Sequence, residues 1–458
     1  MTAFFHRRLF SRFFPWFSFQ CLLLACLLTT APSSVALEAI EDSETIVLPA
    51  DFNNVHFYLL TVDAGKLLWD KFGHTALRVV DEGTQTDIVL NWGSFDFSDP
   101  ISFSIKFFRG ITDFKLEPWS TEQFYNAYSL QGRTLWQDKI NLTNSQKEVL
   151  YKRIAWNLRA ENISYSYHYF FDNCTTRLRD YLDEAMGGKI AMETRGIIQS
   201  TFRDKIRYHY SSMPFIAGAL DVLLNSDVDR PISQWEEMFL PLSLRSTLTR
   251  LSSDVITNRQ ALPLLSEPET IFEFTPPQAK TSVWLYVVLG LLAPLLLLCF
   301  FLKRVPLSAL THPSGLILRS PAFSYRVLAI VGILVSLCSG VLGLIMATGW
   351  IMSGQTELHH NVNLLLFWPT DLFGLVISVY WLISVKPWSL GSKLHTIISY
   401  YLLAHVLALF LYPLVFFLGI SDQAQGAILL FVAPGLLLFT ILVGTVGFSV
   451  NRSPASYY

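Results

Sequence analysis

The chain has 458 residues, of which 52% are hydrophobic and only 15% are charged. Its mean hydropathy of +0.38 is too high for an ordinary soluble protein, so we expect part of the chain to lie in a membrane. The formal net charge is −2, and the sequence has no basic block or stripe of basic and aromatic residues. This composition argues against a nucleic-acid partner.

Residues 1–36 have the pattern of an export signal. Three arginines precede an apolar run over 13–28, and the segment ends in Ser34-Val35-Ala36, which suits signal peptidase. We therefore predict a cleaved signal peptide over 1–36, followed by an exported domain over 37–277. Two alternatives stay open, an uncleaved signal that acts as an anchor and lipid attachment at Cys26.

The exported domain is predicted to contain both strands and helices. Three short segments, 55–62, 75–80 and 87–92, are rich in β-branched and aromatic residues and predict strands. A turn-prone Asp-Glu-Gly sequence joins the last two, which favours a hairpin. Apolar residues then recur at helical spacing over 121–130 and 144–159. These patterns predict an α+β fold.

Cys174 is the only cysteine of the predicted exported domain, so no disulfide can form within it. Asp172 or Asn173 is suited to cap a helix, which would place Cys174 in the first helical turn. Free N–H groups and the helix dipole lower a thiol's pKa there, and the same N–H groups can bind an oxyanion. His74, at the entrance of a predicted strand, supplies a base. The pair predicts a thiol nucleophile, and the alternative is a buried structural cysteine.

The C-terminal part of the chain is predicted to be an all-α membrane domain over 278–458. Five apolar stretches are long enough to cross about 30 Å of hydrocarbon as helices of roughly 20 residues. They lie near 283–302, 327–350, 362–384, 396–419 and 427–449. Basic residues follow the first, third and fifth stretches and are missing from the loops after the second and fourth. This distribution predicts a multi-pass inner-membrane protein with a periplasmic N-terminal domain and a cytoplasmic C-terminus.

Four motifs carry a resemblance to a known family. They are Phe72-Gly73-His74-Thr75-Ala76-Leu77-Arg78-Val79, Asn91-Trp92-Gly93-Ser94-Phe95-Asp96-Phe97, Asp172-Asn173-Cys174-Thr175-Thr176-Arg177 and, in the membrane half, His360-Asn361-Val362-Asn363-Leu364-Leu365 through Trp368-Pro369. Over roughly residues 50–270 the chain resembles the Lnb-type family of bacterial lipoprotein intramolecular transacylases. The order of histidine before cysteine resembles the circularly permuted NlpC-type branch of papain-like thiol enzymes, which includes lecithin:retinol acyltransferase.

The resemblance implies roles for particular residues. Cys174 would be the nucleophile and His74 the base. The family moves an acyl chain from the glyceride of a lipoprotein's N-terminal cysteine to the amino group of that cysteine. Papain-like sites also use a polar residue to hold the imidazole tautomer, for which Asn91 is the first candidate and Asp87 the second. No metal or cofactor is expected, since no HExxH, CxxC or paired-carboxylate spacing occurs.

Further residues are predicted to contact a substrate, namely Arg177, His360, Asn361 and Asn363. Arg177, one turn after Cys174, could bind a phosphate or carboxylate, although a solvated or ion-paired arginine is the alternative. His360 lies on the external side beside a predicted span and could line a lipid entrance, and the alternative is an interfacial histidine. Asp371, within the third stretch, is expected to face protein or a water cavity. With Asn361 and Asn363 nearby, it suggests a groove that contacts the substrate, and the alternative is helix-helix hydrogen bonding.

The predicted function is that of a membrane-bound, cysteine-dependent acyltransferase or ester hydrolase. It would act on lipid or lipoprotein acyl groups at the outer face of the inner membrane, through an acyl-thioester. Five spans favour a lipid substrate, because a wall peptidase needs at most one anchor. Two alternatives remain, a non-catalytic envelope scaffold or binding protein and a peptidoglycan thiol peptidase.

Overall fold

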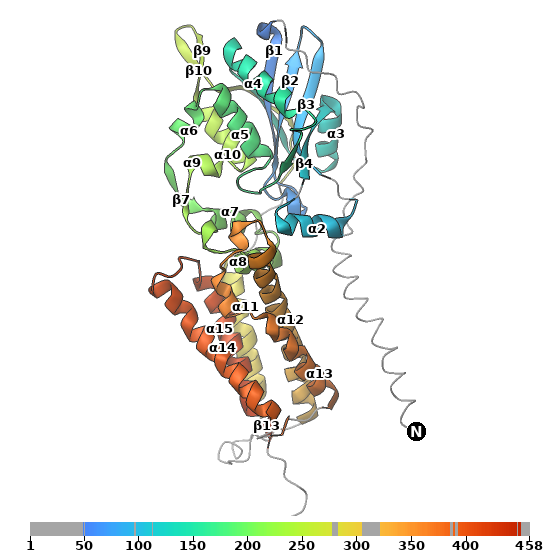
Figure 1. The fold of residues 1–458 in the computed structure, drawn as a ribbon, viewed down its shortest axis with the longest axis vertical. Coiled ribbons are helices and arrows are strands. Elements are labelled where there is room, and N and C mark those ends of the chain that lie inside the picture. Colours follow the sequence, from blue (N-terminus) through green and yellow to red (C-terminus); the bar gives the residue numbers. More distant parts are fainter. Residues whose placement is uncertain are drawn as a thin grey trace, which may run out of the picture.

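A computed structural model describes residues 49, 51–95, 98–111, 113–276, 283–304, 321–384, 388–389, 393–446 and 448–449. The predicted signal peptide over 1–36 lies outside the described residues. Figure 1 shows two parts, an N-terminal domain built on a β-sheet and, below it, a bundle of long helices from the C-terminal part of the chain.

A seven-stranded antiparallel sheet forms the framework of the N-terminal domain. Its strand order is β11-β5-β1-β2-β3-β4-β6. The strands are β1 (Val55–Val62), β2 (His74–Asp81), β3 (Thr86–Ser94), β4 (Asp113–Ser120), β5 (Leu135–Ile140), β6 (Ser164–Ser166) and β11 (Leu265–Phe272). The three predicted strands are thus confirmed, and β2 and β3 form the expected hairpin.

Helices cover both faces of this sheet, because alternate residues of a strand point to opposite sides. Helix α3 (Thr121–Leu130) packs on one face through Phe124 and Tyr128. Helices α4 (Asn144–Asn157) and α5 (Cys174–Ala185) pack on the other face, against a larger apolar core. Both α3 and α4 lie where helical periodicity placed them.

Shorter elements complete the domain. The helices are α2 (Pro100–Arg109), α6 (Lys189–Glu193), α7 (Phe202–His209), α8 (Pro214–Leu223), α9 (Gln234–Glu237) and α10 (Pro241–Arg250). Single 3-10 turns are η1 (Phe52–Asn54), η2 (Leu68–Asp70) and η3 (Ser226–Val228). Two small strand pairs join β7 (Ile197–Thr201) to β8 (Pro231–Ser233) and β9 (Ser252–Thr257) to β10 (Gln260–Pro263).

The C-terminal part is helical and apolar. Its helices are α11 (Val283–Leu302), α12 (Pro321–Met352), α13 (Gly374–Ser384), α14 (Lys393–Phe417) and α15 (Gly426–Val446), with the 3-10 turns η5 (Thr356–Leu358), η6 (Val362–Leu365) and η7 (Pro369–Phe373) and the paired two-residue strands β12 (Trp388–Ser389) and β13 (Phe448–Ser449). Within the described residues, three helices, α12, α14 and α15, are long and apolar enough to span a membrane, or four if a bent pair counts as one span. Gly290–Leu302 is a shorter apolar helix. The chain is therefore a membrane protein, and the count of five spans stays a prediction.

The third predicted span differs from expectation because it is not one continuous helix. The segments Thr356–Leu365 and Pro369–Ser384 meet at a bend of 59°. Pro369 has no N–H to donate and disfavours helical backbone at Trp368, whose ψ is 135°. The Asp371 carboxylate then accepts a hydrogen bond from Trp368 N at 3.1 Å, and the chain resumes a helical course.

Candidate active site at Cys174

Cys174 is the first residue of α5, as its sequence context predicted. Asn173 is the N-cap, and its side-chain oxygen accepts hydrogen bonds from Thr175 N at 2.8 Å and Thr176 N at 2.9 Å. The amide group of Asn173 donates to the carbonyl oxygens of Tyr169 and Phe239. This buried cap fixes the start of the helix and with it the position of the thiol.

His74 begins β2 at the same end of the sheet. Gly73 precedes it with φ +85°, and a Cβ there would lie 2.7 Å from the carbonyl oxygen of Val62, so the tight approach requires glycine. The His74 ring stacks on Tyr128 of α3, with ring centroids 5.8 Å apart. The imidazole is therefore held by both the strand and the helix above it.

Asn91 of β3, the first candidate for the third residue, contacts the imidazole. His74 Nε2 donates to Asn91 Oδ1 at 2.6 Å. Since Nε2 is committed to Asn91, Nδ1 is the ring nitrogen left for the thiol. The second candidate, Asp87, lies elsewhere, in a bidentate ion pair with Arg78 at 2.6 and 2.8 Å.

The surroundings of Cys174 favour the thiolate. Burial raises the pKa of this thiol, but the charge and hydrogen bond of His74, the N–H of Thr75 and the hydroxyl of Thr175 outweigh burial and bring the pKa to about 7. The Thr175 hydroxyl lies 3.7 Å from the sulfur and 3.0 Å from the hydroxyl of Thr75. The thiolate is therefore more favoured here than in a free cysteine.

The first turn of α5 offers fewer free N–H groups than the sequence suggested. Asn173 binds the N–H groups of Thr175 and Thr176 through its side chain and that of Arg177 through its carbonyl oxygen. The N–H of Cys174, the first residue of the helix, has no hydrogen-bond partner among the described residues. It is therefore the group of this turn that can receive an oxyanion.

Arg177 lies one turn after Cys174 but is already engaged. Its guanidinium group binds the Asp172 carboxylate through two hydrogen bonds, of 2.7 and 2.9 Å, and lies 3.8 Å from the ring centroid of Tyr165. These contacts match the ion-paired alternative. They stabilise the segment before Cys174. The Asp172 carboxylate neutralises the charge of Arg177.

The three candidates from the membrane half are not brought to Cys174. His360 is exposed, with its ring 4.8 Å from that of Trp350. Asn361 and Asn363 are buried, and both donate hydrogen bonds to the carbonyl oxygen of Val222 at the end of α8. The two asparagines therefore fasten α8 to the bundle. Their positions are those of structural hydrogen-bonding residues between helices.

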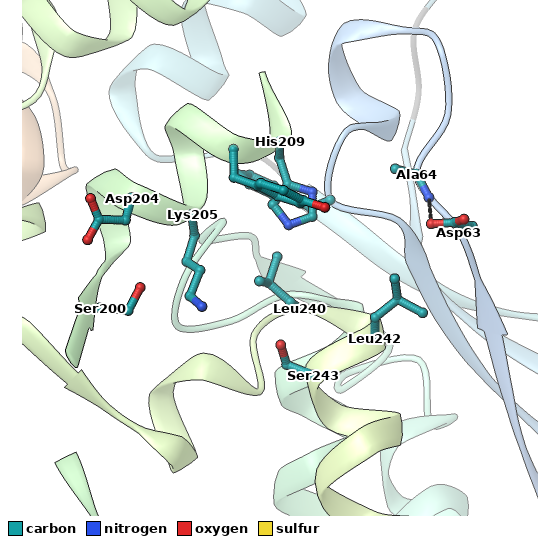
Figure 2. Close-up of a pocket in the computed structure, with 11 residues that line it drawn as sticks. Asp63, Ala64, Ser200, Asp204, Lys205, His209, Leu240, Leu242 and Ser243 are labelled. Carbon is teal, nitrogen blue, oxygen red and sulfur yellow. Dashed lines mark hydrogen bonds between the residues drawn. The ribbon is translucent and has the colours of Figure 1, made fainter. Parts of the chain in front are cut away.

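Figure 2 shows a cleft of about 430 Å³ whose lining does not include Cys174, His74 or Asn91. It is lined by Asp63, Ala64, Phe72, Ser200, Asp204, Lys205, Tyr208, His209, Leu240, Leu242 and Ser243. Phe72 is two residues before His74, and Leu240 follows Phe239, whose carbonyl oxygen holds the N-cap of α5. Burial raises the pKa of Asp63 and lowers that of His209 to about 4. The cleft thus has both polar and apolar side chains in its wall, among them an imidazole that is neutral at pH 7.

Several contributors to the centre were missed by the sequence reasoning. Thr75 and Thr175 bond to the sulfur, and Phe124 and Tyr128 pack around the imidazole. The spacing of four between Phe124 and Tyr128 marks one helix face, which was an available signal. The described residues hold no group of three or more histidine, cysteine or acidic side chains that could bind a metal ion.

The comparison with protein families supports the resemblance noted above. Residues 48–207 match the family model of the Lnb N-terminal periplasmic domain, and this segment includes His74, Asn91 and Cys174. No curated protein and no solved structure matches the chain.

Proposed function

We propose that this membrane protein, which carries an Lnb N-terminal periplasmic domain, is a cysteine-dependent acyltransferase or ester hydrolase acting on lipid or lipoprotein acyl groups. The observation that carries the proposal is the Cys174, His74 and Asn91 constellation. A thiol at a helix N-terminus, a histidine that lowers its pKa and an amide that holds that histidine are the parts of a nucleophilic site.

The proposed reaction has two steps. Nδ1 of His74 takes the proton of Cys174, and the thiolate attacks an ester carbonyl whose oxyanion faces the Cys174 N–H. The carbon-oxygen bond breaks, the leaving alkoxide takes the proton from His74, and a thioester remains on Cys174. An amine, an alcohol or water then attacks the thioester, gives its proton to His74 and releases the thiolate, which recovers the proton.

Contacts with the membrane half support a lipid substrate. The segment before Cys174 bonds to Glu357, in the loop after α12, through His168 Nε2 at 3.3 Å and the Tyr169 hydroxyl at 3.4 Å. The centre is therefore tied to the end of a membrane-spanning helix, where acyl esters lie. We place it at the outer face of the inner membrane, on a multi-pass chain of five spans with a cytoplasmic C-terminus.

The test is the intact mass of the detergent-purified protein after incubation with diacyl lipopeptide and phospholipid. We expect a gain of one acyl chain on Cys174, absent from both Cys174→Ala and His74→Ala. The lipid consumed identifies the donor. Folded protein that presents a titratable thiol but gives neither adduct nor product would refute acyl transfer. Release of wall peptides instead would indicate a peptidase, and a silent Cys174→Ser variant a scaffold.

A further inference from the structure

Helix α2 (Pro100–Arg109) is fastened to the end of a membrane helix. Three hydrogen bonds hold it there, from Ser353 Oγ to Phe108 O at 2.5 Å, from Gly354 N to Arg109 O at 2.9 Å and from Gln355 Nε2 to Phe107 O at 3.1 Å. These donors directly follow α12, which ends at Met352. Figure 1 shows α2 crosswise to α12, beside its upper end. The position of α2 along the axis of α12 is therefore fixed.

The apolar outer surface of α12 continues up to that height. Its last two residues, Ile351 and Met352, are 83% and 57% exposed in the isolated chain. Large apolar side chains at the end of a spanning helix are covered by the outer leaflet of the bilayer. Since α2 bonds to the next three residues along the chain, it is held at the level of this exposed apolar end of α12.

Helix α2 has apolar side chains on two sides. Phe103 and Phe107, four residues apart, pack inward on the aromatic residues of the domain. Ile101 and Ile105, also four residues apart, are 71% and 54% exposed. One apolar pair of this helix therefore belongs to the core of the domain, and the other faces outward at the level of the leaflet.

The charges of α2 complement a lipid surface. Lys106 and Arg109 are exposed in its last turn, and within the part of the chain that the structure describes neither forms an ion pair. Asp99 caps the other end and binds the N–H groups of Ile101 and Ser102. Apolar side chains beside free cations are the pattern of a helix that lies in a membrane interface and binds anionic headgroups.

We propose that α2 is an in-plane membrane helix, with Ile101 and Ile105 inserted in the outer leaflet and Lys106 and Arg109 bound to phospholipid phosphates. Tyr167 connects the inward side of α2 to the surroundings of the thiol. Phe107 packs on Tyr167, with ring centroids 6.4 Å apart, and the charge of Cys174 acts on the Tyr167 phenol. If the proposed function is correct, α2 brings lipid esters beside Cys174, but lipid contact at α2 does not depend on that chemistry.

The test replaces Ile101 or Ile105 by the photoreactive residue p-benzoylphenylalanine. The full chain, carrying Cys174→Ala so that no acyl-enzyme forms, is placed in vesicles of phosphatidylethanolamine and phosphatidylglycerol and irradiated. Ile256 is the matched control, because it is 71% exposed, like Ile101, but lies on the β9–β10 hairpin at the far end of the domain (Figure 1). We expect covalent phospholipid adducts at positions 101 and 105 and none at 256. No adducts on α2, or equal yields at all three positions, would overturn the proposal.

A second measurement addresses the cations. In the Ile105 photoreactive protein, we expect Lys106→Gln or Arg109→Gln to lower the ratio of phosphatidylglycerol to phosphatidylethanolamine adducts about five-fold, the fold-change that corresponds to about 1 kcal/mol per basic residue. Lys152→Gln, an exposed lysine of α4 paired with Glu148, is the charge-matched control and should leave the ratio unchanged. An unchanged ratio in the two α2 variants would contradict phosphate binding. Because neither readout needs catalysis, a failure here is distinct from a failure of the proposed function.

Discussion

At the scale of single residues, the ionisation of Cys174 can be tested directly. Its pKa is about 7 because the charge and hydrogen bonds of the site outweigh burial. The rate of alkylation by iodoacetamide should therefore rise with pH and reach half of its maximum near pH 7. Burial also raises the pKa values of Tyr128, Tyr165 and Tyr167, so these phenols stay neutral over the same range.

The same titration identifies the cause of the shift. In His74→Ala the lowering contribution of the imidazole is lost while burial remains, so the midpoint should move upward, to the value of a free thiol, about 8.5, or higher. Mass spectrometry of the labelled Cys174 peptide follows the reaction site by site, since Cys299 and Cys338 are also free. A midpoint that stays near 7 in His74→Ala would contradict the assignment of His74 as the group that activates the thiol.

Asn91 is expected to act through the imidazole. Asn91→Ala removes the acceptor of the 2.6 Å hydrogen bond, so the His74 ring loses its fixed tautomer and orientation. We expect acyl-enzyme formation to slow about 100-fold while substrate affinity changes little. The matched variant is Asp87→Asn, on the same strand, which removes the negative charge from the pair with Arg78 and should leave the rate unchanged. Equal losses in both variants would indicate general damage to β3 instead of a role in positioning His74.

At the scale of elements, the sequence predicted best where local signals and tertiary packing agree. The strands over 55–62 and 87–92 are rich in β-branched and aromatic residues, and the structure has β1 and β3 there, each with a run of buried residues. The helix that begins at Cys174 follows from the cap at Asn173, which is a local hydrogen-bonding pattern. The His74 and Asn91 contact could be proposed as well, because both residues lie on neighbouring strands of a hairpin.

Other elements could not be predicted, because tertiary contacts decide them. In α2, Ile101, Phe103, Ile105 and Phe107 alternate with polar residues, a pattern of period 2 that favours a strand. The helix forms nevertheless, since Asp99 and Gly110 cap its two ends, Gly110 with a φ of +69°. Local propensity does not predict that this segment is a helix, because the aromatic side of α2 is stabilised by partners distant in sequence.

The roles of the polar residues in the membrane half could not be predicted from the sequence either. Asn361 and Asn363 suit either a substrate or a neighbouring helix, and only the fold shows the carbonyl oxygens of α8 against them. The Tyr412 hydroxyl completes the hydrogen bonds of Asn363 at 2.6 Å. A short polar motif in a predicted span therefore identifies a buried contact, but not the group on the other side of it.

At the scale of the whole molecule, buried hydrogen bonds join the two parts of the chain. Asn225 donates from its backbone to the carbonyl oxygen of Glu357 at 2.8 Å and from its side chain to those of Thr356 and His359. Arg203, buried nearby, binds the carbonyl oxygen of Asn225 and thereby orders this junction. The N-terminal domain is therefore held in one position on the bundle, which a domain on a flexible tether would not be.

A substitution at Glu357 can test the contact between the N-terminal domain and the loop after α12. Its buried carboxylate bonds to His168 and Tyr169, a few residues before Cys174, while its backbone belongs to the loop after α12. Glu357→Ala leaves His74 and the thiol untouched but removes the side-chain link. We expect a loss of about 1–3 kcal/mol in the free energy of unfolding, because buried polar partners remain unsatisfied.

The acylation rates with two kinds of substrate distinguish an effect of Glu357 on lipid presentation from an effect on the chemistry at Cys174. In Glu357→Ala, acylation of Cys174 by a bilayer lipid should slow, whereas acylation by a short water-soluble ester and the midpoint of alkylation near pH 7 should match the parent protein. Glu148→Ala, which breaks an exposed pair with Lys152 on α4, serves as the control. If both substrates slowed equally, Glu357 would act on the chemistry of the site. If neither slowed, the link between the membrane loop and the segment before Cys174 would have no part in presenting lipid to the thiol.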